Sequence, residues 1–307
     1  MISIGIIGAG IVGERIINQI QQEGKAVIKA VYDEQPERLE FLASEYGVPV
    51  ARSLDEVLHA GIDWLYIGTP PAFHAEVANL AASAGIHILS EKPLAHDAAD
   101  GEKMVVAAQE NRIQTAMHFP LMYKPAVHEM AKRIRSGDIG DVVRVELQTH
   151  FPDWPRLWQQ NPWIASRSQG GFVREVFPHY LQLIHRIFGD LDIHSHLVSY
   201  PEQADLCETG IIAHGRTAGR IPFLLAGISG TGQKELLQFK VYGKEGVLTL
   251  ENWSDLYIER KYQERQLLDG FAEVPSLFAA MQQQSTFLVP FEEGLVVQRY
   301  IDLLLQE

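Results

Sequence analysis

Cysteine is nearly absent from this sequence, which has Cys207 as the only one among its 307 residues. A single thiol excludes an internal disulfide framework and is typical of proteins in a reducing compartment. We expect Cys207 to be a small buried residue within a strand. No apolar run approaches the ~18 residues of a membrane span, and the N-terminus shows no signal-peptide pattern. These absences predict a cytoplasmic protein with no membrane partner.

Positive charge is also scarce, with 26 Lys and Arg against 39 Asp and Glu and a net charge of −13. No run of Lys and Arg offsets this balance, so a nucleic-acid backbone would be repelled. A dinucleotide is not excluded, because backbone N–H groups at a helix N-terminus can hold a pyrophosphate without net positive charge. The length and the 46% hydrophobic content fit two domains, each with its own core.

The first 118 residues alternate short apolar runs with longer segments whose apolar residues lie three and four apart. The runs, which predict strands, are 2–7, 26–32, 64–68, 87–89 and 114–117. The segments between them, which predict helices, are 11–22, 36–46, 72–84 and 97–110. This alternation predicts an α/β domain over residues 1–120, a Rossmann-type doubly wound parallel sheet. Ligands of such sheets bind at the carboxyl ends of the strands.

The pattern changes after Tyr123. Helices are expected at 126–136 and 172–188, on either side of a long strand at 142–151. Further strands are expected at 193–200, 206–214, 221–228, 235–242, 246–251 and 255–260. Consecutive strands joined by turns predict antiparallel pairing. Residues 121–307 should therefore form an α+β domain with a large, mainly antiparallel open sheet, and an amphipathic helix at about 291–305 could pack back on the first domain.

A glycine-rich turn follows the first predicted strand and opens the first predicted helix, with the sequence Gly8-Ala9-Gly10-Ile11-Val12-Gly13. In this strand–turn–helix context the glycine spacing is typical of dinucleotide binding. Gly8 allows the tight turn, Gly10 lets the backbone approach the pyrophosphate, and Gly13 permits close packing of helix on sheet. We expect this segment, Ile11 and Val12 included, to contact the cofactor.

An acidic residue, Asp33, ends the second predicted strand, where it can accept hydrogen bonds from the ribose hydroxyls of a dinucleotide. A 2′-phosphate there would face this carboxylate and that of Glu34. NAD(H) is therefore favoured as cofactor, and NADP(H) stays possible. Arg38 could reach back toward such a phosphate, or it could be a solvated side chain in the first turn of its helix.

The strand at 87–89 ends in Ser90-Glu91-Lys92-Pro93, at the edge where the nicotinamide should lie. Lys92 can donate a hydrogen bond to a substrate oxygen and stabilise a developing alkoxide. Glu91 could pair with a cofactor group or orient the lysine. From spacing alone, a surface lysine ahead of a helix is an equally good interpretation.

Several motifs together resemble the Gfo/Idh/MocA family, the family of glucose–fructose oxidoreductase and inositol dehydrogenase. In the first domain these are the glycine loop, Thr69-Pro70-Pro71 with His74, and Glu91-Lys92-Pro93-Leu94. In the second they are Ser136-Gly137-Asp138-Ile139-Gly140, Gly170-Gly171 with Glu175 and His179, and Val241-Tyr242-Gly243 with Gly246. The resemblance spans essentially the whole chain. It adds Thr69, Pro70, His74, Glu91 and Lys92 to the expected cofactor contacts.

The resemblance implies that Lys92 and His179 flank the nicotinamide, with His179 as general acid/base, a role that suits its ordinary pKa of ~6.5. Glu175 stands where the family usually has an aspartate, four residues before the histidine. This separation of one helical turn puts both side chains on one face. The carboxylate would then bind a substrate hydroxyl or hold the ring. Gln182 replaces a second aspartate, so the site has lost a charge.

The substrate pocket departs further from the family. Met122 stands where an arginine is common, and His118 could line the pocket instead or lie on the surface. The loop after the long strand holds Trp154, Trp158 and Trp163, three of the five tryptophans. Such rings stack well on sugars, but they could equally pack the loop or form a subunit interface. We include Trp154 and Trp163 among the expected substrate contacts.

The resemblance therefore implies an NAD(H)-dependent oxidoreductase that transfers hydride to or from a sugar, a polyol or a related hydroxyl or carbonyl compound. A reductase of the same family acting on an aldehyde, dihydrodiol or imine is an alternative, because the pocket is altered. A non-catalytic dinucleotide sensor is another. We expect no metal and a small-molecule substrate. The open sheet of the second domain predicts a homodimer or homotetramer.

Overall fold

The computed structural model describes residues 1–159, 161–283 and 285–306. The chain divides into two compact units. The first contains Met1–Phe119 and Pro275–Arg299, and the second contains Pro120–Val274 and Tyr300–Glu307. The chain therefore returns to the first unit after completing the sheet of the second. Each unit is described below by itself.

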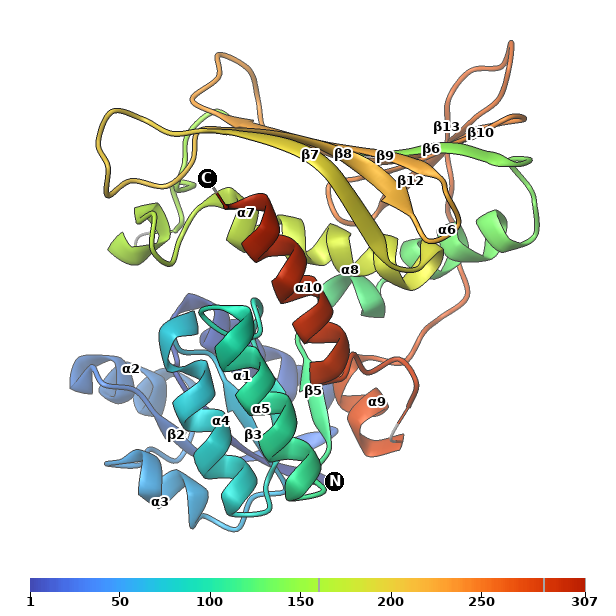
Figure 1. Cartoon of the computed structure of the whole chain (residues 1–307). Helices are drawn as coiled ribbons and strands as arrows, with labels where there is room; N and C mark the ends of the chain where they lie inside the picture. Colours follow the sequence, from blue (N-terminus) through green and yellow to red (C-terminus); the bar gives the residue numbers. More distant parts are fainter. Residues whose placement is uncertain (160, 284, 307) are drawn as a thin grey trace. The chain divides into compact units, whose positions relative to one another are not determined.

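The first unit is a five-stranded parallel sheet with the strand order β2-β1-β3-β4-β5. Its strands are β1 (Ile2–Ile7), β2 (Ala26–Tyr32), β3 (Trp64–Ile67), β4 (His87–Ser90) and β5 (Thr115–Met117). Its helices are α1 (Ile11–Glu23), α2 (Pro36–Tyr46), α3 (Leu54–Leu58), η1 (Pro71–Phe73), α4 (His74–Ser83), α5 (Ala98–Glu110) and α9 (Leu277–Gln283). This is the expected Rossmann-type fold, and Figure 1 draws its first 119 residues from blue to green and α9 in orange-red.

The sheet is buried on both faces, because nearly every residue of β1, β3 and β4 is inaccessible to solvent. Local sequence sets the helix ends. Asp97 accepts a hydrogen bond from the N–H of Asp100 and caps α5. Gly24 ends α1 in the left-handed conformation that glycine adopts without strain. The strand order reverses direction between β1 and β3, so the turns after these two strands border the crevice where this fold binds ligands.

The second unit is an eight-stranded sheet with the order β13-β12-β11-β10-β6-β9-β8-β7. Its strands are β6 (Val142–Phe151), β7 (Leu191–Ser199), β8 (Gly210–Thr217), β9 (Pro222–Ser229), β10 (Leu236–Gly243), β11 (Val247–Glu251), β12 (Asp255–Glu259) and β13 (Gln266–Leu267). Among the described strands of this second sheet, only β6 and β9 pair in parallel, so the sheet is mainly antiparallel, as expected.

Helices of the second unit cover one face of this sheet. They are η2 (Pro120–Tyr123), α6 (Pro125–Arg135), η3 (Pro162–Ala165), α7 (Phe172–Glu175) and α8 (Phe177–Phe188), and α10 (Phe291–Leu304) has residues in both units. Figure 1 shows α6 and α8 on one side of the sheet and none of this unit's described helices on the other. Residues of β8 accordingly alternate between buried and exposed along the strand.

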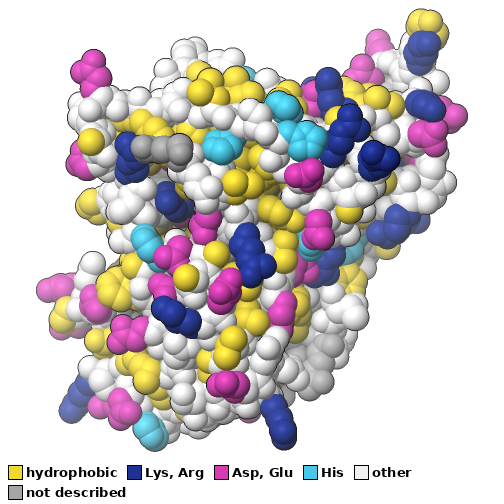
Figure 2. Space-filling view, viewed as in Figure 1, with side chains coloured by type: hydrophobic (Ala, Val, Ile, Leu, Met, Phe, Trp, Pro, Cys, Tyr) yellow, Lys and Arg dark blue, Asp and Glu magenta, His cyan; other side chains and the backbone are white. Residues whose placement is uncertain are grey.

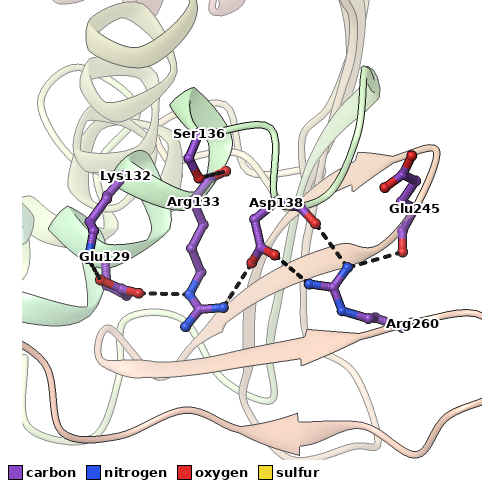
Figure 3. Close-up of polar contacts among 7 residues, drawn as sticks. All are labelled: Glu129, Lys132, Arg133, Ser136, Asp138, Glu245 and Arg260. Carbon is purple, nitrogen blue, oxygen red and sulfur yellow. Dashed lines mark hydrogen bonds and ion pairs between the residues drawn. The ribbon is translucent and has the colours of Figure 1, made fainter.

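An ion-pair network in the second unit is centred on Asp138, in the segment Ser136-Gly137-Asp138-Ile139-Gly140 (Figure 3). The Asp138 carboxylate accepts hydrogen bonds from Arg133 Nη1 at 2.8 Å and Arg260 Nη2 at 2.5 Å. Arg133 also donates to Glu129 at 2.8 Å, and Arg260 Nη1 donates to the Asp138 carbonyl at 2.9 Å. Burial alone would raise the pKa of Asp138, but the two arginines outweigh it and lower this pKa. The network thus joins α6, the entry to β6 and the end of β12.

Three expectations about the second unit were wrong in detail. The helix expected over 172–188 is interrupted at Val176, since Pro178 has no N–H to donate to the carbonyl of Arg174 and its ring crowds that carbonyl. The strand expected from 206 begins only at Gly210. Cys207 is buried, as expected, but lies outside any strand, and burial raises the pKa of its thiol to about 12.

Acidic and basic side chains are interspersed over the face of the molecule shown in Figure 2. No helix among the described residues is long and apolar enough to cross a membrane.

Candidate functional site

The glycine loop connects β1 to α1, and each glycine has a distinct physical requirement. Gly8 has a φ of +80°, and a Cβ there would lie 2.5 Å from the backbone of Gly68 and Thr69. A Cβ on Gly13 would lie 2.5 Å from the Gly8 carbonyl oxygen. Around Gly10 nothing lies within 4 Å of the Cβ position. Packing therefore requires Gly8 and Gly13, whereas the space beside Gly10 is open for a ligand at the helix N-terminus.

Asp33 and Arg38 hold this loop from the second strand and the second helix. Asp33 Oδ2 accepts a hydrogen bond from the N–H of Ala9 at 2.8 Å. Arg38 Nε donates to the Ala9 carbonyl at 2.7 Å, and its guanidinium pairs with Glu14. Arg38 is therefore not a solvated side chain, because it is engaged with the loop itself. The Asp33 carboxylate lies at the end of β2, where the ribose of a dinucleotide would be expected.

His74 joins the turns that follow β3 and β4. It is fully buried, and its Nε2 lies 2.8 Å from the carbonyl oxygen of Thr69. Its Nδ1 lies 3.1 Å from the carbonyl oxygens of both Pro93 and Leu94. Burial lowers the pKa of His74 and outweighs these acceptors, which favour the charged ring. These bonds give His74 a positioning role, because they fix the turn that contains Lys92.

Thr69 carries an observation that fits a cofactor. Its Oγ1 is buried and has no hydrogen-bond partner among the described residues. Thr69 and Pro70 follow β3 directly, and the Thr69 backbone touches the Gly8 position. An unsatisfied hydroxyl beside an open glycine turn is a site for a polar ligand group. The residues present therefore fit a dinucleotide along the ends of β1, β2 and β3.

Glu91 lies beside Lys92 and makes its contacts within the first unit. Its Oε1 accepts hydrogen bonds from the Tyr66 hydroxyl at 3.0 Å and from His118 Nδ1 at 2.5 Å. The N–H of His118 in turn donates to the carbonyl of Ser90 at 2.8 Å. Burial raises the pKa of the Glu91 carboxyl, but the charge and hydrogen bond of His118, with Lys92 and Tyr66, outweigh burial and bring it to about 2. Glu91 is thus an ionised carboxylate that holds His118.

In the second unit, His179 lies on α8 and is 6% exposed. Its ring packs edge-to-face against Trp253, with 5.0 Å between the ring centroids. Trp253 lies in the loop between β11 and β12, with a φ of +71°, and also packs on Tyr180. Sequence analysis missed Trp253. Asn252 before it predicts a turn with positive φ, but no local signal predicts the contact with His179.

Glu175 and Gln182 occupy different helices. Glu175 is the last residue of α7, so the expectation that it shares a continuous helical face with His179 was wrong, because the helix is interrupted after it. Gln182 lies on α8 three residues after His179 and is fully buried. Residues three apart on one helix are neighbours on its surface, so His179 and Gln182 share a side of α8.

Glu208 is a second buried acid that sequence analysis missed. Its Oε1 accepts a hydrogen bond from the N–H of Val173 at 2.7 Å, in the first turn of α7. A Cβ on Gly171 would lie 2.2 Å from Glu208 Oε2, so the carboxylate explains why glycine stands there. Burial raises the pKa of Glu208 to about 7. This acid therefore titrates near neutrality next to the helix that ends in Glu175.

The aromatic loop after β6 is packed down at its first tryptophan. The Trp154 ring lies 4.9 Å from that of Phe151 and 5.9 Å from that of Phe172, centroid to centroid. The Arg156 guanidinium lies 4.7 Å from the centre of the Phe151 ring. These contacts favour the packing role for Trp154. Trp158 is 43% exposed and Trp163 is half-buried.

Met122, at the position where the family often has an arginine, is buried at 5% exposure. No group of three or more His, Cys, Asp or Glu residues in the described part of the chain could hold a metal ion.

The first unit thus has the loop, the strand-end acid and the fixed lysine turn of a dinucleotide-binding oxidoreductase. A family model described as an oxidoreductase family with an NAD-binding Rossmann fold matches residues 2–119. A second, described as the GFO/IDH/MocA C-terminal domain, matches residues 127–249. The chain therefore belongs to the GFO/IDH/MocA oxidoreductase family. This confirms the resemblance inferred from its motifs and the NAD-binding Rossmann fold.

Individual relatives agree with this assignment. A Streptococcus pneumoniae protein described as an uncharacterized oxidoreductase is 33% identical over 192 residues, 62% of this chain and 51% of that protein. The inositol 2-dehydrogenase of Rhizobium meliloti is 27% identical over 190 residues, 62% of this chain and 56% of that enzyme. The chain spans about half the length of these curated relatives.

Among solved structures, a levoglucosan dehydrogenase in complex with NADH is similar to this chain with a TM-score of 0.84. The match covers 99% of this chain and 95% of the other, at 19% identity. At this identity the likeness shows the shared fold.

Proposed function

We propose that this protein is an NAD(H)-dependent oxidoreductase that oxidises a hydroxyl group, or reduces the corresponding carbonyl, of a sugar, a polyol or a related compound. The observation that carries the proposal is the common edge of the first unit's sheet. There the open glycine turn, the Asp33 carboxylate and the Lys92 turn all follow the carboxyl ends of parallel strands.

In this proposal the pyrophosphate of NAD lies over Gly10 and the first turn of α1, where Ile11 and Val12 are each more than a third exposed. Asp33 binds the adenosine ribose, and the Thr69 hydroxyl and Pro70 contact the dinucleotide further along. When bound, NAD accepts or supplies the hydride. NADP(H) would bring a phosphate against Asp33 and is therefore disfavoured.

The chain's own residues handle the oxygen and the proton. Lys92 donates a hydrogen bond to the reacting oxygen and stabilises the negative charge that develops on it. His179 takes the hydroxyl proton in oxidation and returns it in reduction, and Trp253 fixes its ring. Glu175 and Gln182 hydrogen-bond further groups of the substrate, and Trp163 lines the pocket.

The test is a panel of candidate substrates, in which turnover is measured by the change in nicotinamide absorbance. Inositol and levoglucosan would be offered with NAD, and sugar-derived and simple aldehydes and ketones with NADH. We expect turnover of at least one hydroxyl compound, lost in Lys92→Ala and kept in Lys103→Ala, a matched change on the exposed face of α5. Tight dinucleotide binding without any turnover would contradict the enzyme and support a sensor.

A reductase of small aldehydes or imines is the second candidate. It is favoured by the neutral, fully buried Gln182 and the buried Met122, which stand where the family commonly has groups that bind hydroxyls. Turnover of simple aldehydes with no turnover of polyols would select this candidate over the first.

We also propose a cytoplasmic homodimer or homotetramer that uses the outer face of the second unit's sheet. Leu197, Ile212 and Ile228 are 68%, 56% and 45% exposed on the neighbouring strands β7, β8 and β9. A patch of large apolar side chains on neighbouring strands is typical of a protein interface. Size-exclusion chromatography should show an oligomer that dissociates on Ile212→Lys. A monomeric wild type would overturn this assignment.

A further inference from the structure

The cluster formed by Tyr66, Glu91 and His118 is not required by the proton and hydride steps proposed above. Tyr66 is fully buried on β3, Glu91 follows β4, and His118 follows β5. Three neighbouring strands therefore each supply one member, at the carboxyl edge of the sheet. Glu91 is also the residue next to Lys92. This location places the cluster where ligands of the fold bind.

The hydrogen-bond chemistry of the cluster fixes which nitrogen of His118 carries a proton. An ionised carboxylate can only accept hydrogen bonds, so both of its partners must donate. Tyr66 donates its hydroxyl, since burial and the charge of Glu91 raise the pKa of this phenol well above its usual value. His118 must then donate from Nδ1, which lies 2.5 Å from Glu91 Oε1. Whenever the ring is neutral, its lone pair is therefore on Nε2.

The other nitrogen of His118 is available to a ligand. Nε2 makes no hydrogen bond with the residues that the structure describes, and 12% of the side chain is exposed. The N–H of His118 is tied to Ser90, so its backbone is also fixed relative to the Lys92 turn. With the ring neutral, Nε2 is a rigid acceptor that hydrogen-bonds a hydroxyl group and cannot pair with a carboxylate or phosphate oxygen, which also only accepts.

We infer that His118 is a specificity-determining residue of the proposed reaction, which presents Nε2 as an acceptor for a hydroxyl group of the substrate. The inference rests on the proposed function and deepens it, because it selects compounds with a hydroxyl group beside the reacting centre. Glu91 and Tyr66 are positioning residues that act through His118. A buried acceptor built to read a hydroxyl discriminates strongly against the analogue that lacks it.

The tautomer can be measured in the wild-type protein. Nitrogen-15 NMR of labelled histidine should show the His118 ring protonated at Nδ1 when neutral, with assignment from His118→Phe. In Glu91→Gln this preference should weaken, and in His59→Gln, a change at an exposed histidine, it should stay. In the wild type, a neutral ring protonated at Nε2, or a ring that carries both protons at neutral pH, would overturn the inference.

Binding to the NADH-saturated protein tests the role directly, because a polyol and NADH cannot react with one another. The probes are inositol, levoglucosan and their monodeoxy analogues. We expect one deoxy analogue to bind the wild type at least ~10-fold more weakly than its parent. In His118→Phe the parent should weaken to the level of that analogue, with NADH affinity within about two-fold.

The outcomes separate this inference from the proposed function. Equal weakening of every probe in His118→Phe, or no change, overturns the role of His118 and leaves the function standing. If no probe binds the wild-type NADH complex, the hydroxyl-compound substrate itself is refuted, and this role with it.

Discussion

In the first unit, the candidate residues lie in turns at strand ends, and hydrogen bonds to charged or backbone groups hold them in place. His74 bridges two turns through three carbonyl groups, and Glu91 binds Tyr66 and His118. In the second unit, His179 lies on a helix and is held by aromatic packing against Trp253. The contacts of the first unit depend on an ionised carboxylate, whereas those of His179 are made by ring packing. The candidate residues of the two units should therefore respond differently to substitution.

The largest expected effect is on catalysis and involves one residue from each unit. Lys92→Ala and His179→Ala should each lower kcat/KM by at least ~100-fold, because each removes a group that acts on the reacting oxygen or its proton. NADH affinity should stay within about two-fold in both variants. Steady-state kinetics and fluorescence titration measure the two quantities. Turnover retained in either variant would remove that residue from the mechanism.

The polar cluster of the first unit should make the free energy of unfolding depend on pH in the acid range. The pKa of Glu91 is lowered to about 2 in the folded protein, so its stabilisation is present above the ordinary pKa of 4.5 and is lost as pH falls toward 2. The full effect is roughly 3 kcal/mol. Urea unfolding should show Glu91→Gln less stable than wild type at pH 7, with a smaller difference at pH 3. An equal difference at both pH values would contradict the ionised carboxylate.

Glu208, the buried acid of the second unit, should have the opposite effect and lower the stability as pH rises. The pKa of Glu208 is raised to about 7, so the folded state favours the protonated acid and loses stability as pH rises from about 4.5 through 7. Between pH 5 and pH 8 this loss is about 2 kcal/mol. Glu208→Gln, which keeps an acceptor for Val173, should lack the dependence. Parallel curves of stability against pH for the wild type and Glu208→Gln would refute the raised pKa of Glu208.

The smallest expected effect concerns the network around Asp138. Its partners are partly exposed, so solvent screens the ion pairs. Asp138→Asn should lower the free energy of unfolding by about 1 kcal/mol, and high salt should reduce the difference from wild type. Lys244→Gln, at an exposed pair with Asp141, is the matched control and should change stability little. A loss above about 3 kcal/mol would contradict the view that these ion pairs are weakened by solvent screening.

The same contrast explains what could be predicted from the sequence. The loop from Gly8 to Gly13 and the strand before it follow from local spacing, so both were anticipated. The interruption before Pro178 was not predicted, although proline cannot continue the hydrogen bonding of a helix and its position in the sequence indicates a break. The predicted limits of β8 were less accurate, because the residues around Cys207 give no clear turn signal that marks where the strand begins.

The contacts that complete the site were beyond local reasoning. Glu91 meets Tyr66 and His118 across more than 20 residues of sequence, and Glu208 meets Val173 across 35. Trp253 reaches His179 only because the hairpin of β11 and β12 brings it there. Side-chain partners of this kind depend on the tertiary fold, so residue type and spacing give no signal for them.

The most direct test of the central claim is to titrate the purified protein with NADH and NADPH and to measure the two affinities from nicotinamide fluorescence. Asp33→Asn keeps an acceptor for the Ala9 N–H but removes the charge, and Glu40→Gln controls for charge at an exposed residue of α2. We predict tighter binding of NADH than NADPH in wild type and Glu40→Gln, and a shift toward NADPH in Asp33→Asn. Absence of binding by either dinucleotide in the wild type would contradict the account.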